Sequence, residues 1–102
     1  MLELRPSCEH CAKPLPPDSE DAMICSYECT FCAGCVHQLL GGTCPNCGGG
    51  FVPRPIRPST AWRPGVSLAH QPASTDHKHK PVDLQAHAEL LRRIGGRSPV
   101  LR

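Results

Sequence analysis

The chain has 102 residues and a net charge of +2, with eight cysteines and twelve prolines but only one tryptophan, one tyrosine and two phenylalanines. This length accommodates at most one modest domain with extensions. So few large apolar side chains exclude a fold held by hydrophobic burial alone, because such a core supplies only a few kcal/mol. Disulfide bonds or metal ions must provide the remaining stability.

The first residues give no indication of export. The segment from Met1 to Pro6 is charged from Glu3 onward and lacks the apolar region of a signal peptide. No run approaches the ~20 apolar residues of a membrane span. We therefore expect a cytoplasmic protein with no membrane association, whose thiols stay reduced. Disulfide bonds would require another export route, so metal ligation is the favoured interpretation of the cysteines.

Charge divides the chain into an acidic head and a basic tail. Residues 1–52 carry two basic and six acidic side chains, a net charge of −4, whereas residues 53–102 carry nine basic and three acidic ones, a net charge of +6. Two zinc ions on eight thiolates would add a further charge of about −4 to the head. The small overall charge therefore hides a strong asymmetry.

Four segments are expected along the chain. They are a double-zinc domain over residues 1–54, a proline-rich linker over 55–81, an amphipathic helix over 82–95 and a tail over 96–102. The linker begins with a proline at nearly every second or third position of residues 53–58, which favours extended polyproline II backbone. Its Ser, Thr, Pro and Gly content is typical of a flexible segment.

Short elements are expected inside the head. Three prolines exclude helix and central strand from the loop Pro14–Ser19, and Ala22–Ile24 is a candidate strand leading into the second cysteine pair. After Cys35, helical spacing of apolar residues predicts a short helix, formed by Val36, Leu39 and Leu40. Gly41-Gly42 should end it.

A terminal helix is predicted over Asp83–Ile94. Asp83 can cap its start, Gly95-Gly96 can close its end, and Glu89 and Arg93 are spaced to pair at i, i+4. At about 12 residues it is marginal as a free helix, so its apolar face must lie on the head or on a partner. The residues predicted to bind a partner are Leu84, Leu91, Ile94, Arg54 and Arg57.

The cysteines form four close pairs within residues 8–47: Cys8/Cys11, Cys25/Cys29, Cys32/Cys35 and Cys44/Cys47. A two-residue gap lets both thiolates of a pair reach one ion while backbone N–H groups point at the sulfurs, and zinc takes four such ligands. Four pairs therefore predict two Zn2+ ions. If the pairs stay intact, three groupings satisfy this requirement.

The full spacing, C-x2-C-x13-C-x3-C-x2-C-x2-C-x8-C-x2-C, resembles that of RING fingers, with Cys29 where that family usually has His. Phe31 before Cys32 and Pro45 after Cys44 agree as well. The resemblance covers residues 8–47 and implies a small metal-stabilised α+β fold with short hairpins, one short helix and RING-like cross-brace ligation. It implies a first site of Cys8, Cys11, Cys32 and Cys35, and a second site of Cys25, Cys29, Cys44 and Cys47.

A physical consideration favours the same interleaving. Only two residues separate Cys29 from Cys32, so the two sites must lie close together and share one small core. Interleaved ligands tie the chain at both ends, so neither site forms without much of the other. Each structural zinc contributes on the order of 10 kcal/mol to folding.

A second resemblance covers the whole head. Residues 1–58, including the string CEHCAKPLPPDSEDAMICSYECTFCAGCVHQLLGGTCPNCGGGFVPRPIRP, are similar to a family of short bacterial proteins catalogued as domain of unknown function twelve seventy-two. This resemblance implies a cytosolic bacterial zinc-binding protein without an established activity. It says little about the chain after Pro58.

An iron–sulfur centre is a weaker interpretation of the cysteines. Cys29, Cys32 and Cys35 copy three positions of a bacterial ferredoxin run, but eight residues instead of three separate Cys35 from Cys44. Cys25 also has no place in that pattern. A brown protein that absorbs visible light would overturn the zinc interpretation.

Ubiquitin-ligase activity is a second alternative that the sequence disfavours. His10 stands where ligase RING domains usually place an apolar contact residue, residues 36–43 contain no Trp, and Gly48 stands where a basic residue is usual nearby. A scaffold can be shared without its function.

Nucleic-acid binding is the principal alternative to a protein partner. Trp62 can stack on a base, and several tail residues can neutralise phosphates, namely Arg54, Arg57, Arg63, Arg92, Arg93 and Arg97. However, these residues are spread over about fifty positions, and the acidic head would repel a duplex. We expect this tail to fold back in part on its own head.

No catalytic constellation is present, because metal claims every thiolate and closed four-Cys sites leave no open coordination position. His10 and His37 are expected beside the metal sites and not as ligands, and His77 and His79 are expected in a solvated turn. The sequence therefore predicts a structural zinc-binding module that mediates protein interactions, with no small-molecule substrate evident. Its protein partner is unidentified.

Overall fold

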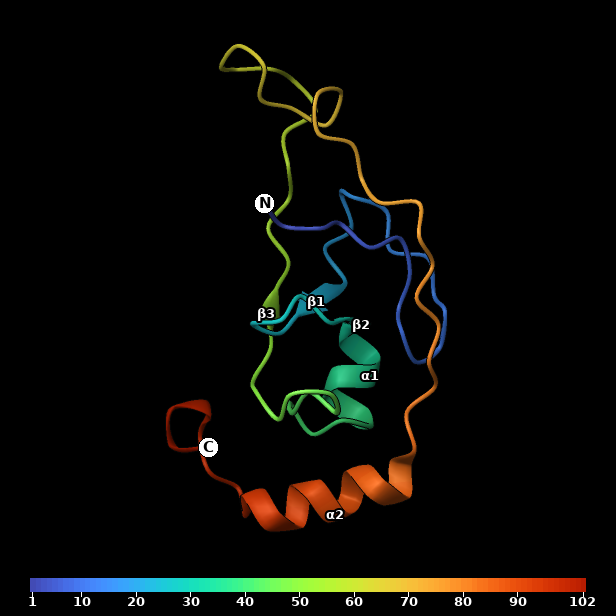
Figure 1. The fold of residues 1–102 in the computed structure, drawn as a ribbon, viewed down its shortest axis with the longest axis vertical. Helices are drawn as coiled ribbons and strands as arrows, with labels where there is room; N and C mark the ends of the chain where they lie inside the picture. Colours follow the sequence, from blue (N-terminus) through green and yellow to red (C-terminus); the bar gives the residue numbers. More distant parts are fainter.

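The computed structural model describes all 102 residues and has the predicted α+β architecture. Its centre is a three-stranded antiparallel sheet in the order β2-β1-β3, formed by β1 (Ala22–Ile24), β2 (Thr30–Cys32) and β3 (Val52–Pro53). Met23 in β1 pairs with Phe31 on one side and with Pro53 on the other. The sheet and helix α1 lie in the middle of the molecule (Figure 1).

Helix α1 (Ala33–Gln38) follows β2 directly and begins two residues before Cys35, earlier than the sequence predicts. Its apolar face is also narrower than expected: Val36 and Leu40 are buried, but Leu39 is 41% exposed. The reason is that the helix ends at Gln38, and Gly41 and Gly42 then turn the chain with φ values of 59° and 70°. Both are left-handed conformations that glycine adopts without strain.

The core is small and consists largely of sulfur. Six of its eleven buried residues are cysteines, and the others are Leu15, Ala22, Phe31, Val36 and Leu40. Phe51 packs edge-on against Phe31, with 5.6 Å between ring centroids. Because cysteines make up most of this core, whatever holds their sulfurs together also holds the fold together.

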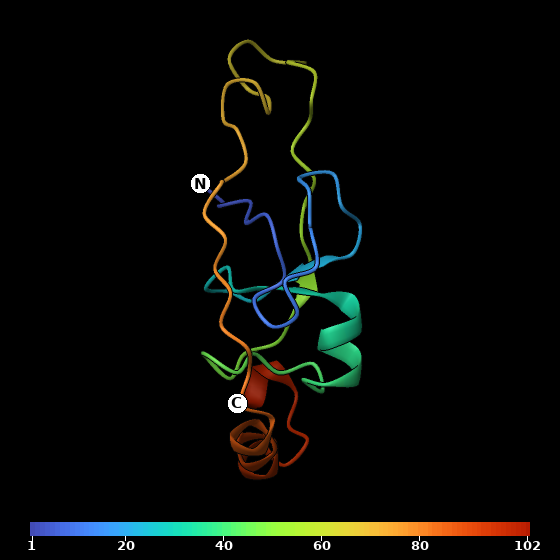
Figure 2. The same cartoon turned by 90° about the vertical axis from the view of Figure 1, so that its right-hand side faces the viewer.

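Residues 55–83 contain no helix or strand, as expected for a proline-rich linker, but much of this segment lies against the head. The Ser74 N–H donates to Leu4 O at 3.0 Å and the Lys80 N–H donates to Glu9 O at 2.8 Å. Both views show residues 73–82 running along the side of the head (Figures 1 and 2). The linker thus carries the chain from one end of the molecule to the other.

Residues 58–72, here called the arm, project from the end of the molecule opposite helix α2 (Figure 2). Their ends are joined by a hydrogen bond from the Leu68 N–H to Pro58 O at 2.9 Å. At the base, Arg57 donates to Gln71 O at 2.6 Å and to Leu2 O at 2.7 Å. Trp62 is 80% exposed on this arm.

Helix α2 (Leu84–Ile94) has the predicted caps: Asp83 accepts the N–H groups of Gln85 and Ala86, and Gly95 ends the helix with φ of 63°. Glu89 pairs with Arg92 at i, i+3 and not with the expected Arg93. The helix lies along the outside of the head, beyond α1 (Figure 1). No helix in the structure has the length and apolarity to cross a membrane.

Arg54 is an interior residue, although the sequence suggested a partner contact. It is only 4% exposed, and its guanidinium donates to Arg5 O, Leu15 O and Pro16 O at 2.8, 3.2 and 2.8 Å. Burial lowers the pKa of this guanidinium. Arg54 therefore fastens the strand β3 end of the head to its N-terminal loops.

Replacing Arg54 by alanine should lower the free energy of unfolding by about 2 kcal/mol or more, because backbone carbonyls lose a charged donor. Arg54→Lys should recover little, since an ammonium lacks the planar fork that reaches three carbonyls. Urea denaturation of the metal-loaded protein measures both effects. The control, Arg63→Ala on the exposed arm, should change stability by about 0.5 kcal/mol or less; equal stabilities for Arg54→Ala and wild type would contradict this role.

Candidate metal centres

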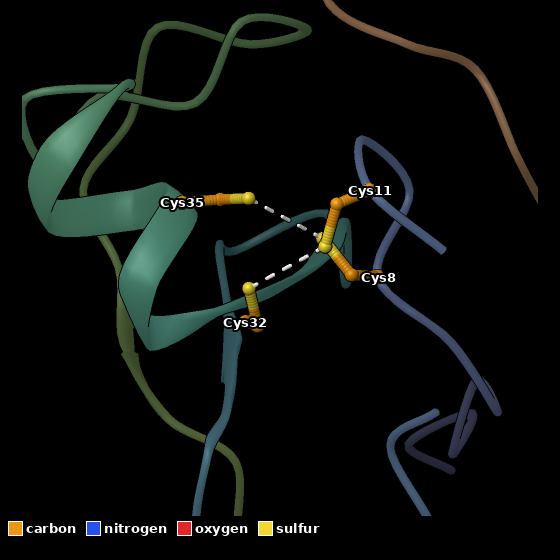
Figure 3. Close-up of side chains that lie close together, drawn as sticks. All are labelled: Cys8, Cys11, Cys32 and Cys35. Carbon is orange, nitrogen blue, oxygen red and sulfur yellow. Dashed lines mark hydrogen bonds between the residues drawn. The ribbon is translucent and has the colours of Figure 1, made fainter. Parts of the chain in front are cut away.

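Four thiols from two distant parts of the chain meet at the first cluster, defined as Cys8, Cys11, Cys32 and Cys35. All four sulfur atoms lie within 4.8 Å of one another. Figure 3 shows Cys8 and Cys11 approaching from the N-terminal loop, and Cys32 and Cys35 from the start of α1. The sulfurs of Cys8 and Cys35 are 3.9 Å apart, and those of Cys11 and Cys32 are 3.8 Å apart.

These separations fit one tetrahedral ion. Zn–S bonds of about 2.3 Å give a tetrahedron whose sulfur atoms are about 3.8 Å apart. A disulfide would require about 2.0 Å, and all eight cysteines are free thiols. A four-iron cluster would hold the thiolates further apart, because a cube of iron and sulfide stands between them. The donor set of the first cluster therefore fits a single metal ion.

The second cluster comprises Cys25, Cys29, Cys44 and Cys47. The sulfurs of Cys25, Cys44 and Cys47 lie within 4.8 Å of one another, and Cys29 lies outside this group. Cys29 is nevertheless close enough to Cys25 and Cys44 for both to affect the pKa of its thiol. Cys25 and Cys29 flank the turn between β1 and β2, whereas Cys44 and Cys47 come from the loop after α1. The chain thus alternates between the two clusters, pair by pair, as the predicted grouping requires.

The pairs Cys8/Cys11 and Cys44/Cys47 have the same backbone design. In the first, the Ala12 N–H donates to Cys8 O and the Cys8 N–H donates to Lys13 O, both at 2.9 Å. In the second, the Gly48 and Cys44 N–H groups make the equivalent bonds at 2.8 Å. The residue after each pair is left-handed, with φ of 62° at Ala12 and 75° at Gly48.

Backbone N–H groups also point at the sulfurs of the second cluster, as expected for thiolate ligands. The Tyr27 N–H donates to Cys25 Sγ at 3.3 Å, and those of Asn46 and Gly49 donate to Cys44 Sγ and Cys47 Sγ at 3.4 Å. The side-chain amide of Asn46 reaches Cys29 Sγ at 3.5 Å. These donors stabilise negative charge on sulfur.

Burial of the cysteines opposes the formation of negative charge on their sulfurs. It raises the pKa of the Cys35 and Cys44 thiols, and neighbouring cysteines raise the pKa of both further. At Cys11 burial acts in the same direction, but hydrogen bonds from the Lys13 N–H and from other cysteines outweigh it and lower the pKa. Four thiolates this close together repel one another, so a cation is needed before all can ionise.

Glu9 links the two clusters, a role that sequence reasoning missed. Its buried carboxylate accepts the Thr30 N–H at 2.6 Å and the Arg5 guanidinium at 2.9 Å. The Glu9 N–H in turn donates to Thr30 O at 3.0 Å. Thr30 lies between Cys29 and Cys32, so this contact fixes the first pair against the strand that separates the clusters. A single charged residue between two cysteines of a pair gives no sequence signal for it.

The histidines near the cysteines bind other parts of the chain. His10 Nδ1 accepts the Val82 N–H at 2.8 Å, and the His10 carbonyl accepts His79 Nε2 at 3.1 Å. His77 is hydrogen-bonded to Ser7 at 3.2 Å, and His37 is exposed at the end of α1. His10, His77 and His79 therefore fasten the linker to the head.

The apolar face of α2 rests on the head. Leu91 lies against Gly41, Ile94 is half-buried beside Cys47, and Leu84 remains 42% exposed. At the centre of this face is His87, which is 3% exposed and donates from Nε2 to Leu40 O at 2.8 Å. Sequence reasoning overlooked His87, although it stands three residues after Leu84 and four before Leu91.

The comparisons with known proteins agree on the head of the chain. A family model described as "Protein of unknown function (DUF1272)" matches residues 1–57. An uncharacterised protein of Rhizobium meliloti (strain 1021) is 59% identical over 81 residues, which cover 79% of this chain and 89% of the relative. This alignment is longer than the family match, so the relative also shares part of the chain after residue 57. No solved structure matches the chain.

The two equivalent turns predict opposite effects of substitution. Ala12→Gly should raise the free energy of unfolding by about 0.5–1 kcal/mol, because glycine removes the cost of a left-handed alanine. Gly48→Ala should lower it by about 1 kcal/mol for the same reason. Chemical denaturation of both variants with metal bound measures the pair. Changes of the same sign would contradict the equivalence of the two turns.

Proposed function

Because this chain belongs to the family of proteins of unknown function (DUF1272), we propose a function for it from the chemistry of its two clusters. It is a structural zinc-binding module with a RING-like cross-brace, which mediates protein interactions and has no catalytic activity of its own. The proposal places it in the reducing cytoplasm, where eight thiols remain available to metal.

The observation that carries this proposal is the sulfur geometry of the first cluster, whose separations of 3.8 and 3.9 Å equal the edge of a zinc–thiolate tetrahedron. Four-sulfur tetrahedral sites favour zinc or iron, and the absence of a ferredoxin spacing after Cys35 favours zinc. Alternation of the pairs between the clusters supports the cross-brace. When bound, each ion would supply folding energy and a closed coordination shell.

The clusters also argue against catalysis by this chain. A four-thiolate ion has no free coordination position for water or substrate. Two serine–histidine pairs exist, Ser7 with His77 at 3.2 Å and Ser67 with His70 at 2.9 Å, but both serines are buried, Ser67 inside the arm. A buried hydroxyl that fastens its own turn is a poor nucleophile for an external substrate.

The proposed interaction surface is the arm. Trp62 is a large apolar residue that is 80% exposed, with Val66 and Ile56 also exposed nearby in sequence. Tryptophan is enriched among residues that dominate binding energy, and the hydrogen bonds at the base of the arm hold it in place before binding. Arg63 beside Trp62 leaves nucleic acid as the alternative partner.

Metal content and stability test the zinc module. Native mass spectrometry of the reduced protein should find two zinc ions per chain, and chelation should unfold the head, because each structural ion contributes on the order of 10 kcal/mol. Circular dichroism before and after chelation measures the loss, and re-addition of zinc should restore the signal. A mass that corresponds to one ion, no ion or an iron cluster per chain would contradict the proposal.

Partner capture tests the arm. Trp62→Ala should reduce capture of the partner about tenfold or more while two zinc ions remain bound, because one buried aromatic anchor is worth about 2 kcal/mol. Quantitative mass spectrometry of proteins captured from cell extract measures this loss, and Tyr27→Ala, exposed on the β1–β2 turn, is the control. Capture of nucleic acid that falls steeply with salt would support the alternative partner.

A further inference from the structure

The C-terminal turn, defined as residues 95–102, folds back from α2 onto the second cluster. Arg102 Nη1 donates to Gly48 O at 3.3 Å, directly after the ligand Cys47. The Pro99 ring, in the 3-10 turn Pro99–Leu101, lies so close to Gly50 that an added Cβ would be 2.7 Å from Pro99 Cγ. The turn therefore contacts the backbone on both sides of Gly49.

The turn is shaped by its own arginines. Arg97 Nη1 donates to Arg93 O at 3.2 Å and to Ile94 O at 3.1 Å, and Arg102 Nε donates to Arg97 O at 3.0 Å. Arg93, Arg97 and Arg102 line one cavity of about 230 Å³ together with Cys47. Three cationic side chains thus gather at the edge of a thiolate cluster.

These arginines have no carboxylate partner. Five ion pairs form in the protein, and none includes Arg93, Arg97 or Arg102, whereas neighbouring Arg92 pairs with Glu89. A divalent ion on four thiolates has a net charge of −2, so a loaded second cluster would supply the missing negative charge. The positive charge of these three arginines would therefore be balanced by the negative charge of the loaded second cluster beside them.

Cys47 is the exposed ligand of the second cluster, since Cys25, Cys29 and Cys44 are buried. A chelator or a thiol reagent must approach this cluster from the Cys47 side, where the turn lies. The exposed ligand of the first cluster is Cys11, and the nearby cation, Lys13, is already paired with Asp21. The linker lies beside the first cluster, where the Lys80 N–H donates to Glu9 O and the Val82 N–H donates to His10, whereas the C-terminal turn lies beside the second cluster.

We propose that the C-terminal turn is a lid on the second cluster, which limits approach to Cys47 and slows loss of the ion that this cluster holds. This inference rests on the proposed zinc-binding function. Arg102 and Pro99 hold the lid closed by contact with Gly48 and Gly50, and Arg93 and Arg97 add counter-charge. None of them is a metal ligand.

Removal of residues 97–102 tests the lid, because it leaves α2 and its Gly95 cap intact. The zinc-loaded chain is exposed to a chromophoric chelator, and alkylation of each cysteine is followed by mass spectrometry. Truncation should speed Cys47 alkylation and the release of one ion by about tenfold, because it removes a few surface contacts of up to about 1 kcal/mol each. The alkylation rate of Cys11 should stay unchanged. Arg102→Ala alone should give up to about fivefold.

Gly50→Ala opens the lid by a different route, since its Cβ would clash with Pro99. It should speed Cys47 alkylation in the full chain but add nothing in the truncated one. Gly34→Ala is the matched control, because no atom lies within 4 Å of its new Cβ. Equal Cys47 and release rates in full and truncated chains that hold two ions would overturn the lid. A wild-type chain holding fewer than two ions would overturn the proposed function itself.

Discussion

Two residues separate Cys29 from Cys32, yet Cys32 belongs to the first cluster and Cys29 lies beside Cys25 and Cys44 of the second. The strand between them, β2, is therefore shared: one end is fixed by the second cluster and the other by the first. Glu9 adds a third attachment by accepting the Thr30 N–H at the start of this strand. Loss of either cluster would release β2, its pairing with β1 and the start of α1, so the head should behave as one cooperative unit.

Features specified by neighbouring residues could be predicted from the sequence. Asp83 and Gly95 cap α2 through groups two to four residues away, and the cysteine pairs belong to local turns. Features that depend on distant residues could not. In the sequence Arg54 resembles the other basic residues of the tail, whereas in the structure its guanidinium donates to the carbonyls of Leu15 and Pro16. The path of the linker depends on single hydrogen bonds such as Lys80 to Glu9, which no composition or period reveals.

The candidate metal centres were more predictable than the fold around them. Ligand spacing is set by covalent geometry, so four cysteine pairs restrict the groupings to a few. The exposure of each ligand could not be predicted in this way. Cys47 lies at the surface and Cys44 in the interior, because exposure depends on what packs over that loop. His87 shows the same limit: its place on the apolar face follows from helical period, but its bond to Leu40 requires knowing where α2 docks.

The asymmetry of charge also has a different meaning in the folded chain. The acidic and basic halves form no ion pair with each other. Tail arginines instead donate to head carbonyls, as Arg57 does to Leu2 and Arg102 to Gly48. Neutral carbonyl acceptors make the docking of the tail less sensitive to salt than a set of surface ion pairs would be.

The exposure of Trp62 on the arm limits what intrinsic fluorescence can report about the folding of this protein. It is the chain's one tryptophan, it is largely surrounded by water when the protein is folded, and it belongs to the arm, which projects from the end of the molecule opposite α2 (Figure 2). Its emission in the native state should already resemble that of a free indole. Intrinsic fluorescence would then stay almost constant while the cysteine core falls apart, and it would respond instead when the arm is covered.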